Sequence, residues 1–325
     1  MRVLVVGGAG YIGSHMVKML GDGGHDVVTY DNLSSGHRDA VLCGTFVEGD
    51  LADAAHLGEV LKPDFDAVMH FASCIQVGES VRLPGKYYGN NFANTLNLLE
   101  AMVAHDIRNF IFSSTAAVYG DPQYHPLDEA HPRRPINPYG RSKSMVEDML
   151  PDFDRAHGLR SVCLRYFNAA GADPAGALGE RHEPETHLIP LILQVASGRR
   201  PHVDVHGRDY PTPDGTCIRD YIHVQDLCMA HLLALETLLA GAGSVAYNLG
   251  SGDGFSVQAI IDAARRVTGK AIRSVDAARR PGDPDRLVAD SSRARSELNW
   301  KPQFSDIDSI IAHAWQWEMR QERNR

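Results

Sequence analysis

The sequence predicts an α/β fold, in which a Rossmann-type, doubly wound parallel sheet is joined to a smaller mixed α/β domain. Three observations predict it: short, continuously apolar runs recur through the first half, helical stretches separate them, and a glycine-rich turn follows the first run. Continuous apolar strands alternating with helices are typical of a parallel sheet covered on both faces. With 325 residues, 43 % of them hydrophobic, the chain is long enough to bury such a core.

The elements of the first half follow in order. The apolar run 3–6 predicts a buried strand, and apolar residues at 12, 16, 17 and 20 predict a helix over 12–20. Further strands, each preceded by a helix or loop, are predicted at 25–30, 45–47, 67–71, 109–113 and 160–166.

The second half has a different texture, because residues 171–187 and 206–216 are rich in Gly, Pro and charge and predict long binding loops. Predicted regular elements there are helices near 225–239, 256–268 and 306–320 and a strand near 245–249. We expect one domain over 1–168, to which about 224–250 returns, and a second domain over 169–325.

Composition excludes several classes of protein. The net charge of −9 offers no broad basic face for nucleic acid. No apolar run approaches the roughly 20 residues that cross a bilayer, and the first strand follows Met1 and Arg2 too closely for a secretory signal. The five scattered cysteines indicate reduced thiols. We therefore expect a cytoplasmic protein that binds neither nucleic acid nor membrane.

A Gly-x-x-Gly-x-x-Gly turn, Gly7, Gly10 and Gly13, lies between the first strand and the first helix. Glycine allows the tight turn and the close approach of a pyrophosphate, and the helix N-terminus offers N–H groups to the anion. Asp31 follows about 20 residues later, where a carboxylate accepts hydrogen bonds from an adenosine ribose and repels a 2′-phosphate. The pattern predicts a dinucleotide site that favours NAD over NADP.

Asp50 follows the third predicted strand, where it is placed to meet the adenine ring. The same residue type is equally suited to cap a helix N-terminus, so the sequence leaves both roles open.

Tyr139 and Lys143 are four residues apart and share one helix face, just after Pro138, which suits a helix start. A phenol is a poor base at its ordinary pKa of about 10, but a nearby ammonium and a positive nicotinamide favour the phenolate. Tyr139 could then take a hydroxyl proton while hydride leaves the same carbon. Thr115 ends a predicted strand, where open α/β sheets hold ligands, and can hydrogen-bond the substrate or Tyr139.

In these motifs the chain resembles the extended short-chain dehydrogenase/reductases and, within them, the UDP-glucose (UDP-galactose) 4-epimerases. The segments that carry the resemblance are 7–15, 30–33, 77–80, 109–120, 138–143, 164–168 and, most specifically, 209–224. The resemblance implies that Tyr139 deprotonates the sugar 4-hydroxyl while hydride passes from C4 to NAD⁺. The 4-keto sugar then turns over and hydride returns to its other face, so NAD stays bound. Further contacts with NAD are expected from Tyr11, Ile12, Asn32, Leu51, Phe71, Ala72, Asn91, Ser113 and Tyr166.

The resemblance also implies that 1–168, with about 224–250, is the NAD-binding domain and that 169–325 is the UDP-sugar-binding domain. Asn168 would bind the diphosphate, with Arg219 and Arg280 as cationic partners that can each bond two phosphate oxygens. Asp283 would hold the uridine ribose. His187 stands where the family often has a substrate-binding Asn, and an imidazole can still donate to phosphate.

Two further positions depart from the family pattern. His206 stands where an aromatic side chain often stacks on uracil; it shares a predicted strand face with His202 and Asp204, but no further ligand is evident and we expect no metal site. Leu287 aligns with a position whose bulk decides whether an N-acetylated sugar fits, and leucine is intermediate. We expect a preference for UDP-glucose and UDP-galactose.

Several alternatives remain. A 4,6-dehydratase would want acids after Thr115, where this chain has Ala116 and Ala117. Epimerases of N-acetylhexosamine, pentose or uronate UDP-sugars stay open. A redox-silent NAD sensor would not need Tyr139, Lys143 and Thr115 together. Relatives are commonly homodimers through helices around 86–104 and 138–155, which implies a homodimer here.

Overall fold

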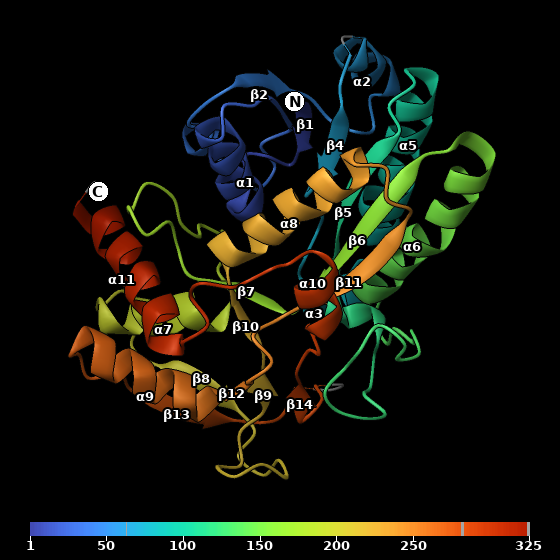
Figure 1. Cartoon of the computed structure of the whole chain (residues 1–325). Coiled ribbons are helices and arrows are strands. Elements are labelled where there is room, and N and C mark those ends of the chain that lie inside the picture. Colours follow the sequence, from blue (N-terminus) through green and yellow to red (C-terminus); the bar gives the residue numbers. More distant parts are fainter. Residues whose placement is uncertain (63, 281–282, 324–325) are drawn as a thin grey trace.

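The computed structural model describes residues 1–62, 64–280 and 283–323, and its main element is a seven-stranded parallel sheet (Figure 1). The strand order is β11-β6-β5-β4-β1-β2-β3, and every pairing between neighbours is parallel. The strands are β1 (Arg2–Val6), β2 (Asp26–Asp31), β3 (Thr45–Glu48), β4 (Ala67–His70), β5 (Asn109–Thr115), β6 (Arg160–Tyr166) and β11 (Val245–Leu249). This topology confirms the predicted doubly wound fold class.

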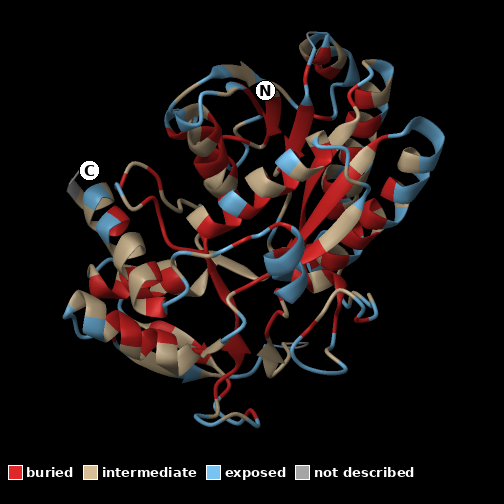
Figure 2. Cartoon of the chain, viewed as in Figure 1, coloured by how far each residue is buried: buried red, intermediate tan, exposed pale blue. Residues whose placement is uncertain are grey.

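Helices cover both faces of the sheet because successive strand residues point to opposite sides. On one face Val3 and Val5 pack with α1 (Tyr11–Asp22) and α8 (Val224–Leu239). On the other, Leu4 and Val6 pack with the helices of the second apolar cluster, which are α2 (Ala54–Leu61), α5 (Asn94–Ala104) and α6 (Pro138–His157). Except for the edge strand β3, the strands of this sheet are buried along most of their length (Figure 2).

The sheet is completed by a segment far along the chain. After β6 the chain leaves the sheet, and it returns through α8, which lies against β5 and β6, to place β11 beside β6. The chain beyond α10 (Ser292–Glu297) also returns here, because Trp300 packs in the same core and its indole N–H donates to the carbonyl oxygen of Asp226 at 2.9 Å. The Asp226 carboxylate accepts from the backbone N–H groups of Gln303 (2.7 Å) and Phe304 (2.8 Å).

The rest of the chain builds three small sheets around a third apolar cluster. They pair β7 (Asn168–Ala170) with β10 (Tyr221–His223), β8 (Val203–His206) with β13 (Ser274–Ala277), and β9 (Ile218–Arg219) with both β12 (Phe255–Ser256) and β14 (Arg286–Leu287). The helices α7 (Leu188–Ala196), α9 (Val257–Thr268) and α11 (Ile307–Arg323) supply the apolar side chains between them. This is the smaller mixed α/β part that the sequence predicts.

Shorter elements complete the described chain. They are α3 (Val77–Arg82), α4 (Pro84–Tyr87), a π-helical stretch over Tyr88–Ala93, and 3-10 turns over Arg38–Ala40 and Ala116–Val118. α7 was not predicted, because its residues are apolar all round and lack the polar face of an amphipathic helix. Across residues 1–62, 64–280 and 283–323, no helix is both long and apolar enough to cross a membrane.

Candidate active site

The glycine turn has no room for side chains. Gly7 has a φ of 79°, and a Cβ there would lie 2.4 Å from the backbone nitrogen of Ala72, just beyond β4. A Cβ on Gly13 would lie 2.1 Å from the carbonyl oxygen of Gly7. Gly10 precedes α1, and among the described residues no side chain caps that helix. The N-terminus of α1 can therefore receive an anion, as the sequence predicts.

Asp31 ends β2 directly beside this turn. Its carboxylate accepts from the backbone N–H of Ala9 (2.9 Å) and of Leu33 (2.8 Å). Burial raises the pKa of Asp31, and these two N–H groups offset part of that effect. Each carboxylate oxygen has a second lone pair, so Asp31 can still accept from ribose hydroxyls.

Asp50 does not cap a helix, which corrects one of its two predicted roles. The N-cap of α2 is Asp53, which accepts from the backbone N–H of His56 at 3.0 Å. Asp50 instead closes a turn with the N–H of Ala52 (2.8 Å) and accepts from the amide of Asn32 (2.7 Å). Asp50 and Asn32 thus meet where β2 and β3 end, with Leu51 buried next to them.

The two proton-handling residues come from neighbouring elements. Thr115 is the last residue of β5, and Tyr139 lies in the first turn of α6, which begins at Pro138 and is capped by Asn137 accepting from the N–H of Gly140 (2.8 Å). Burial raises the pKa of the Tyr139 phenol, and a side-chain hydrogen bond with Thr115 opposes this rise. The protein environment alone therefore favours the protonated phenol of Tyr139 at neutral pH.

Lys143 lies one turn further along α6 and is buried. Its ammonium donates to the hydroxyl of Ser73 (2.5 Å) and to the carbonyl oxygen of Ser113 (2.7 Å), and it lies 4.7 Å from the centre of the Phe112 ring. Burial lowers the pKa of Lys143 to about 7. Ser73 was missed by the sequence analysis, although it follows β4 at the same sheet edge that carries Thr115.

Three other predicted cofactor residues, Ser113, Tyr166 and Asn91, form hydrogen bonds within the protein. The hydroxyls of Ser113 and Tyr166 share a hydrogen bond. The amide of Asn91 accepts from the N–H of Cys74 (2.8 Å) and donates to its carbonyl oxygen (3.0 Å) and to the hydroxyl of Ser142 (3.2 Å). Asn91 thus ties the segment after β4 to α6, and its contact with NAD stays a prediction. Phe71 and Ala72, at the end of β4, lie against the glycine turn.

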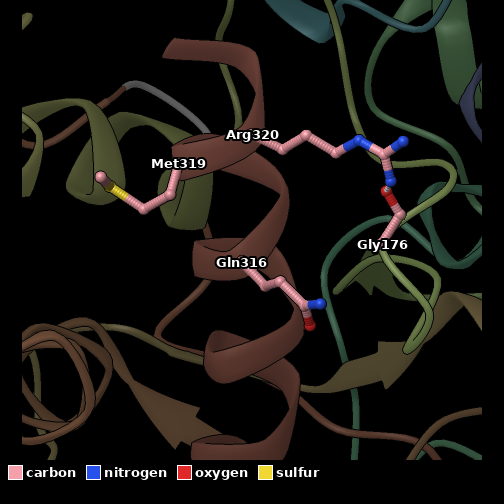
Figure 3. A pocket seen from close by; sticks show the side chains of 4 residues that line it. All are labelled: Gly176, Gln316, Met319 and Arg320. Atoms are coloured by element: carbon pink, nitrogen blue, oxygen red, sulfur yellow. Dashed lines mark hydrogen bonds between the residues drawn. The ribbon is translucent and has the colours of Figure 1, made fainter. Parts of the chain in front are cut away.

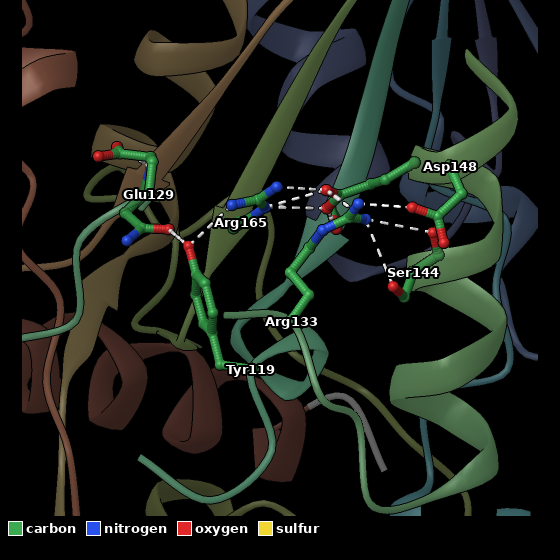
Figure 4. Close-up of polar contacts among 9 residues, drawn as sticks. Tyr119, Glu129, Arg133, Ser144, Asp148 and Arg165 are labelled. Carbon is green, nitrogen blue, oxygen red and sulfur yellow. Dashed lines mark hydrogen bonds and ion pairs between the residues drawn. The ribbon is translucent and has the colours of Figure 1, made fainter. Parts of the chain in front are cut away.

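A buried ion pair fixes α6 to the sheet (Figure 4). Glu147, one turn beyond Lys143, accepts from Nε of Arg165 on β6 (3.0 Å) and from the hydroxyl of Ser114 on β5 (2.5 Å). Arg165 also donates to the hydroxyl of Tyr119 at 3.0 Å. This network positions the helix that carries Tyr139 and Lys143.

Two predicted substrate residues lie on the paired strands β9 and β14, Arg219 and Leu287, and two others precede β14, Arg280 and Asp283. Arg219 forms an ion pair with Asp283 and donates to the carbonyl oxygen of Ile218 at 2.8 Å. Leu287 is the register partner of Arg219. Arg280 is exposed, and its carbonyl oxygen accepts from the backbone N–H of Asp283 at 3.3 Å.

The remaining substrate residues lie on other elements. Asn168 begins β7 and donates its N–H to the carbonyl oxygen of Asp220 at 3.0 Å, next to Arg219. His206 ends β8, with Nδ1 3.2 Å from the carbonyl oxygen of Ala278. His187 precedes α7 and joins Glu180, His182 and Glu185, a grouping that the sequence analysis did not recognise.

A separate cavity lies between α11 and the turn at Gly176 (Figure 3). It is lined by Gly176, Gln316, Met319 and Arg320, and Arg320 donates to the carbonyl oxygen of Gly176 at 2.6 Å. None of the predicted site residues lines it, so it is not the candidate active site.

An open helix N-terminus behind a glycine turn, with a tyrosine and a lysine on the helix at the same sheet edge, defines a dinucleotide-dependent enzyme of the doubly wound class. The chain belongs to the NAD dependent epimerase/dehydratase family, whose sequence model matches residues 3–250.

Individual relatives agree with the resemblance seen in the sequence. The UDP-glucose 4-epimerase of Streptococcus mutans is 54 % identical, over 98 % of this chain and 96 % of the relative. The crystal structure of UDP-glucose 4-epimerase from Brucella ovis in complex with NAD is 51 % identical with a TM-score of 0.95, covering 97 % of each chain. That of UDP-glucose-4-epimerase from Stenotrophomonas maltophila, with bound NAD and formylated UDP-arabinopyranose, is 39 % identical with a TM-score of 0.96 over the whole of both chains.

Proposed function

We propose that this chain interconverts UDP-glucose and UDP-galactose by epimerisation at C4, through a 4-keto sugar and with NAD retained. The observation that carries the proposal is the placement of three residues at one sheet edge: Thr115 ends β5, Tyr139 lies in the first turn of α6, and Lys143 lies one turn further along α6 and donates to the Ser113 carbonyl oxygen. NAD, when bound, accepts the C4 hydride and returns it. The 54 % identity to a UDP-glucose 4-epimerase, over 98 % of this chain, supports the substrate class.

The residues present fit NAD. Gly7 and Gly13 form a turn too tight for a Cβ in front of the N-terminus of α1, which no side chain of the described residues caps. The free lone pairs of Asp31 suit a ribose diol. Lys143 is the residue we expect at the nicotinamide end, since Ser73 and Ser113 hold its ammonium at the carboxyl edge of β4 and β5. We propose that the other predicted contacts, Tyr11, Ile12, Asn32, Asp50, Leu51, Phe71, Ala72, Asn91 and Tyr166, complete this site.

The proton chemistry depends on a filled site. Burial by itself raises the pKa of the Tyr139 phenol and keeps it protonated. The positive charge that arrives with the oxidised cofactor favours the phenolate, as a neighbouring ammonium also does. Tyr139 then takes the proton of the sugar 4-hydroxyl, directly or through Thr115, and returns it when the sugar is reduced on its other face.

The diphosphate requires donors that are not already used. One terminal nitrogen of the Arg219 guanidinium donates to the Asp283 carboxylate, and the other donates to the carbonyl oxygen of Ile218. A guanidinium has five N–H donors, so Arg219 keeps donors for a phosphate. We propose that its remaining donors, with Asn168, Arg280 and His187, bind the diphosphate, while Asp283 and His206 contact the uridine.

The test is direct. Purified chain is incubated with UDP-galactose and no added NAD, and UDP-glucose is followed by anion-exchange chromatography. Conversion by the wild type and not by Tyr139→Phe supports C4 epimerisation with retained cofactor. Absence of conversion even with NAD supplied would refute the proposal, and pentose, uronate and N-acetylhexosamine UDP-sugars would then be tried.

The range of sugars depends on Leu287. Its side chain packs against the apolar cluster of Val118, Tyr119 and Leu127, next to Arg219 in register. We propose that it favours hexoses without an N-acetyl group. Turnover of UDP-N-acetylglucosamine at a rate comparable to UDP-glucose would contradict this, and Leu287→Tyr should then remove only the additional activity.

We also propose a cytoplasmic homodimer with one NAD-binding unit over 1–168 plus 224–250 in each chain. Exposed Val77, Val81 and Leu83 on and after α3, which contacts α6, offer an apolar face for a second copy. A light-scattering mass near that of the 35.6 kDa chain would refute the dimer.

A further inference from the structure

The segment from Glu180 to His187 gathers two imidazoles and two carboxylates. One ligand atom from each of Glu180, His182, Glu185 and His187 lies within 4.8 Å of all the others. Nδ1 of His182 is 3.1 Å from Oε1 of Glu180 and 3.8 Å from Oε2 of Glu185. Nδ1 of His187 contacts the same Glu180 oxygen and is 3.7 Å from Oε1 of Glu185. Both imidazoles therefore aim the same ring nitrogen at one point.

Burial makes this arrangement costly unless a cation joins it. The side chains of Glu180 and Glu185 are only 6 % and 8 % exposed, and that of His182 is 18 % exposed. Nδ1 of His182 is buried and, among the described residues, has no partner at hydrogen-bonding geometry. Two adjacent buried carboxylates require positive charge beside them, which either the two imidazoles or a metal ion can supply. A metal ion would also give Nδ1 of His182 the partner that it lacks among the described residues.

We propose that Glu180, His182, Glu185 and His187 bind one divalent transition-metal ion, with Zn²⁺ the best match. Four nitrogen and oxygen ligands from one short segment suit tetrahedral zinc. Imidazole favours Zn²⁺ and its first-row neighbours, whereas Mg²⁺ and Ca²⁺ take sets of oxygen ligands. The two carboxylates neutralise the charge of the ion. With all four positions taken by protein, the site is structural.

The surroundings show what such an ion would hold in place. The carbonyl oxygen of Glu180 accepts from the indole N–H of Trp317 on α11 at 3.2 Å. Arg181 forms an ion pair with Asp39 in the first half of the chain. The His182 ring meets Tyr11, in the glycine turn, edge to face with ring centres 6.4 Å apart. The ion would therefore fix the segment that links the NAD-binding turn to α7 and α11.

A metal on Nδ1 of His187 also decides the state of the other ring nitrogen. Nε2 must then carry the proton, so His187 becomes a fixed hydrogen-bond donor. This step rests on the proposed function, in which His187 meets the diphosphate, and it converts an ambiguous imidazole into a donor of the kind an anion requires.

The metal site is tested without activity. Chain purified without a histidine tag is stripped with EDTA, titrated with ZnCl₂ by calorimetry, and analysed for zinc by mass spectrometry. We expect one zinc per chain, with X-ray absorption showing nitrogen and oxygen ligands at about 2.0–2.1 Å. His182→Gln should weaken binding at least about tenfold. His202→Gln changes a histidine just before β8 and outside the cluster, and it should leave binding unchanged.

The opposing results are distinct. No stoichiometric zinc in the wild type, or equal binding in His182→Gln, would overturn the proposal and leave the four groups as histidine–glutamate ion pairs. Zinc–sulfur scattering would place the ion at a cysteine and also overturn it. For His187, we expect stripping the metal to weaken UDP binding while NAD is retained. Unchanged UDP affinity would overturn the donor step alone, and an inactive epimerase that still binds zinc would refute only the proposed function.

Discussion

The ion pair between Glu147 and Arg165 allows a sharp prediction about how α6 is held. Both side chains are nearly inaccessible, at 3 % and 8 % exposed. Glu147→Leu would leave the guanidinium of Arg165 buried with only the Tyr119 hydroxyl and no carboxylate, and would remove the acceptor of Ser114. Breaking a buried pair in this way costs about 3–5 kcal/mol of unfolding free energy.

Removing both charges has a different effect. Glu147→Leu combined with Arg165→Met eliminates the unpaired charge together with the desolvation of both groups, and such replacements are often neutral. We expect the double variant to be more stable than Glu147→Leu by at least about 2 kcal/mol. Tyr119 keeps a partner in both, because its hydroxyl also donates to the side-chain oxygen of Asn248 at 2.6 Å.

The assay is urea unfolding followed by circular dichroism, with all variants at the same NAD concentration. Asp148→Asn is the matched control on the same helix, since Asp148 pairs with Arg133 at the surface and its loss should cost less than about 1 kcal/mol. Arg165→Met alone completes the comparison. If the double variant loses as much unfolding free energy as Glu147→Leu and Arg165→Met lose together, Glu147 and Arg165 do not act as a unit and the reasoning fails.

Three further predictions concern the site itself. Tyr139→Phe should lower kcat by about 10²–10⁴-fold with NAD still bound, as measured by its release on denaturation; near-normal turnover would remove Tyr139 from the chemistry. Gly13→Ala should abolish NAD retention, because its Cβ would lie 2.1 Å from a turn carbonyl, while Gly78→Ala, which meets nothing within 4 Å, should not; equal retention would contradict the close-packed turn. Burial lowers the pKa of Lys143 in the folded chain to about 7, from its ordinary 10.5. The cost of the buried ammonium in unfolding free energy is therefore complete below pH 7 and decreases as the pH rises toward 10.5. NAD-free wild type should therefore gain roughly 4 kcal/mol over Lys143→Met between pH 6 and pH 10 in urea unfolding, and a pH-independent difference would refute this.

Much of the first half could be predicted because its elements are long and uniformly apolar. The strand at 160–166 has the observed bounds, and the helix over 12–20 was short by one residue at its start and two at its end. In the second half, strands such as β9, β12 and β14 have only two residues, too few for any periodicity to show, and their pairing is set by contacts distant in sequence.

The site could be predicted where a residue type and its spacing carry the chemistry, and not where partners are chosen in three dimensions. The glycine turn and the Tyr139–Lys143 spacing are of the first kind. Ser73, which takes the Lys143 ammonium, is of the second, because a lone serine after a strand has no distinctive pattern. Of the two roles that the sequence left open for Asp50, the helix cap is excluded, because α2 begins at Ala54 and its N-cap is Asp53.

The late return of β11 to the edge of β6 has a consequence for how the protein is made. As the chain leaves the ribosome, β6 keeps an unpaired edge and the face under α8 stays uncovered until residue 249 has emerged. Most of the loops, strands and helix that we assign to sugar binding must be synthesised before the nucleotide-binding sheet can close. A chain truncated after residue 168 would therefore be an aggregation-prone, protease-sensitive fragment, and not a small functional NAD-binding protein.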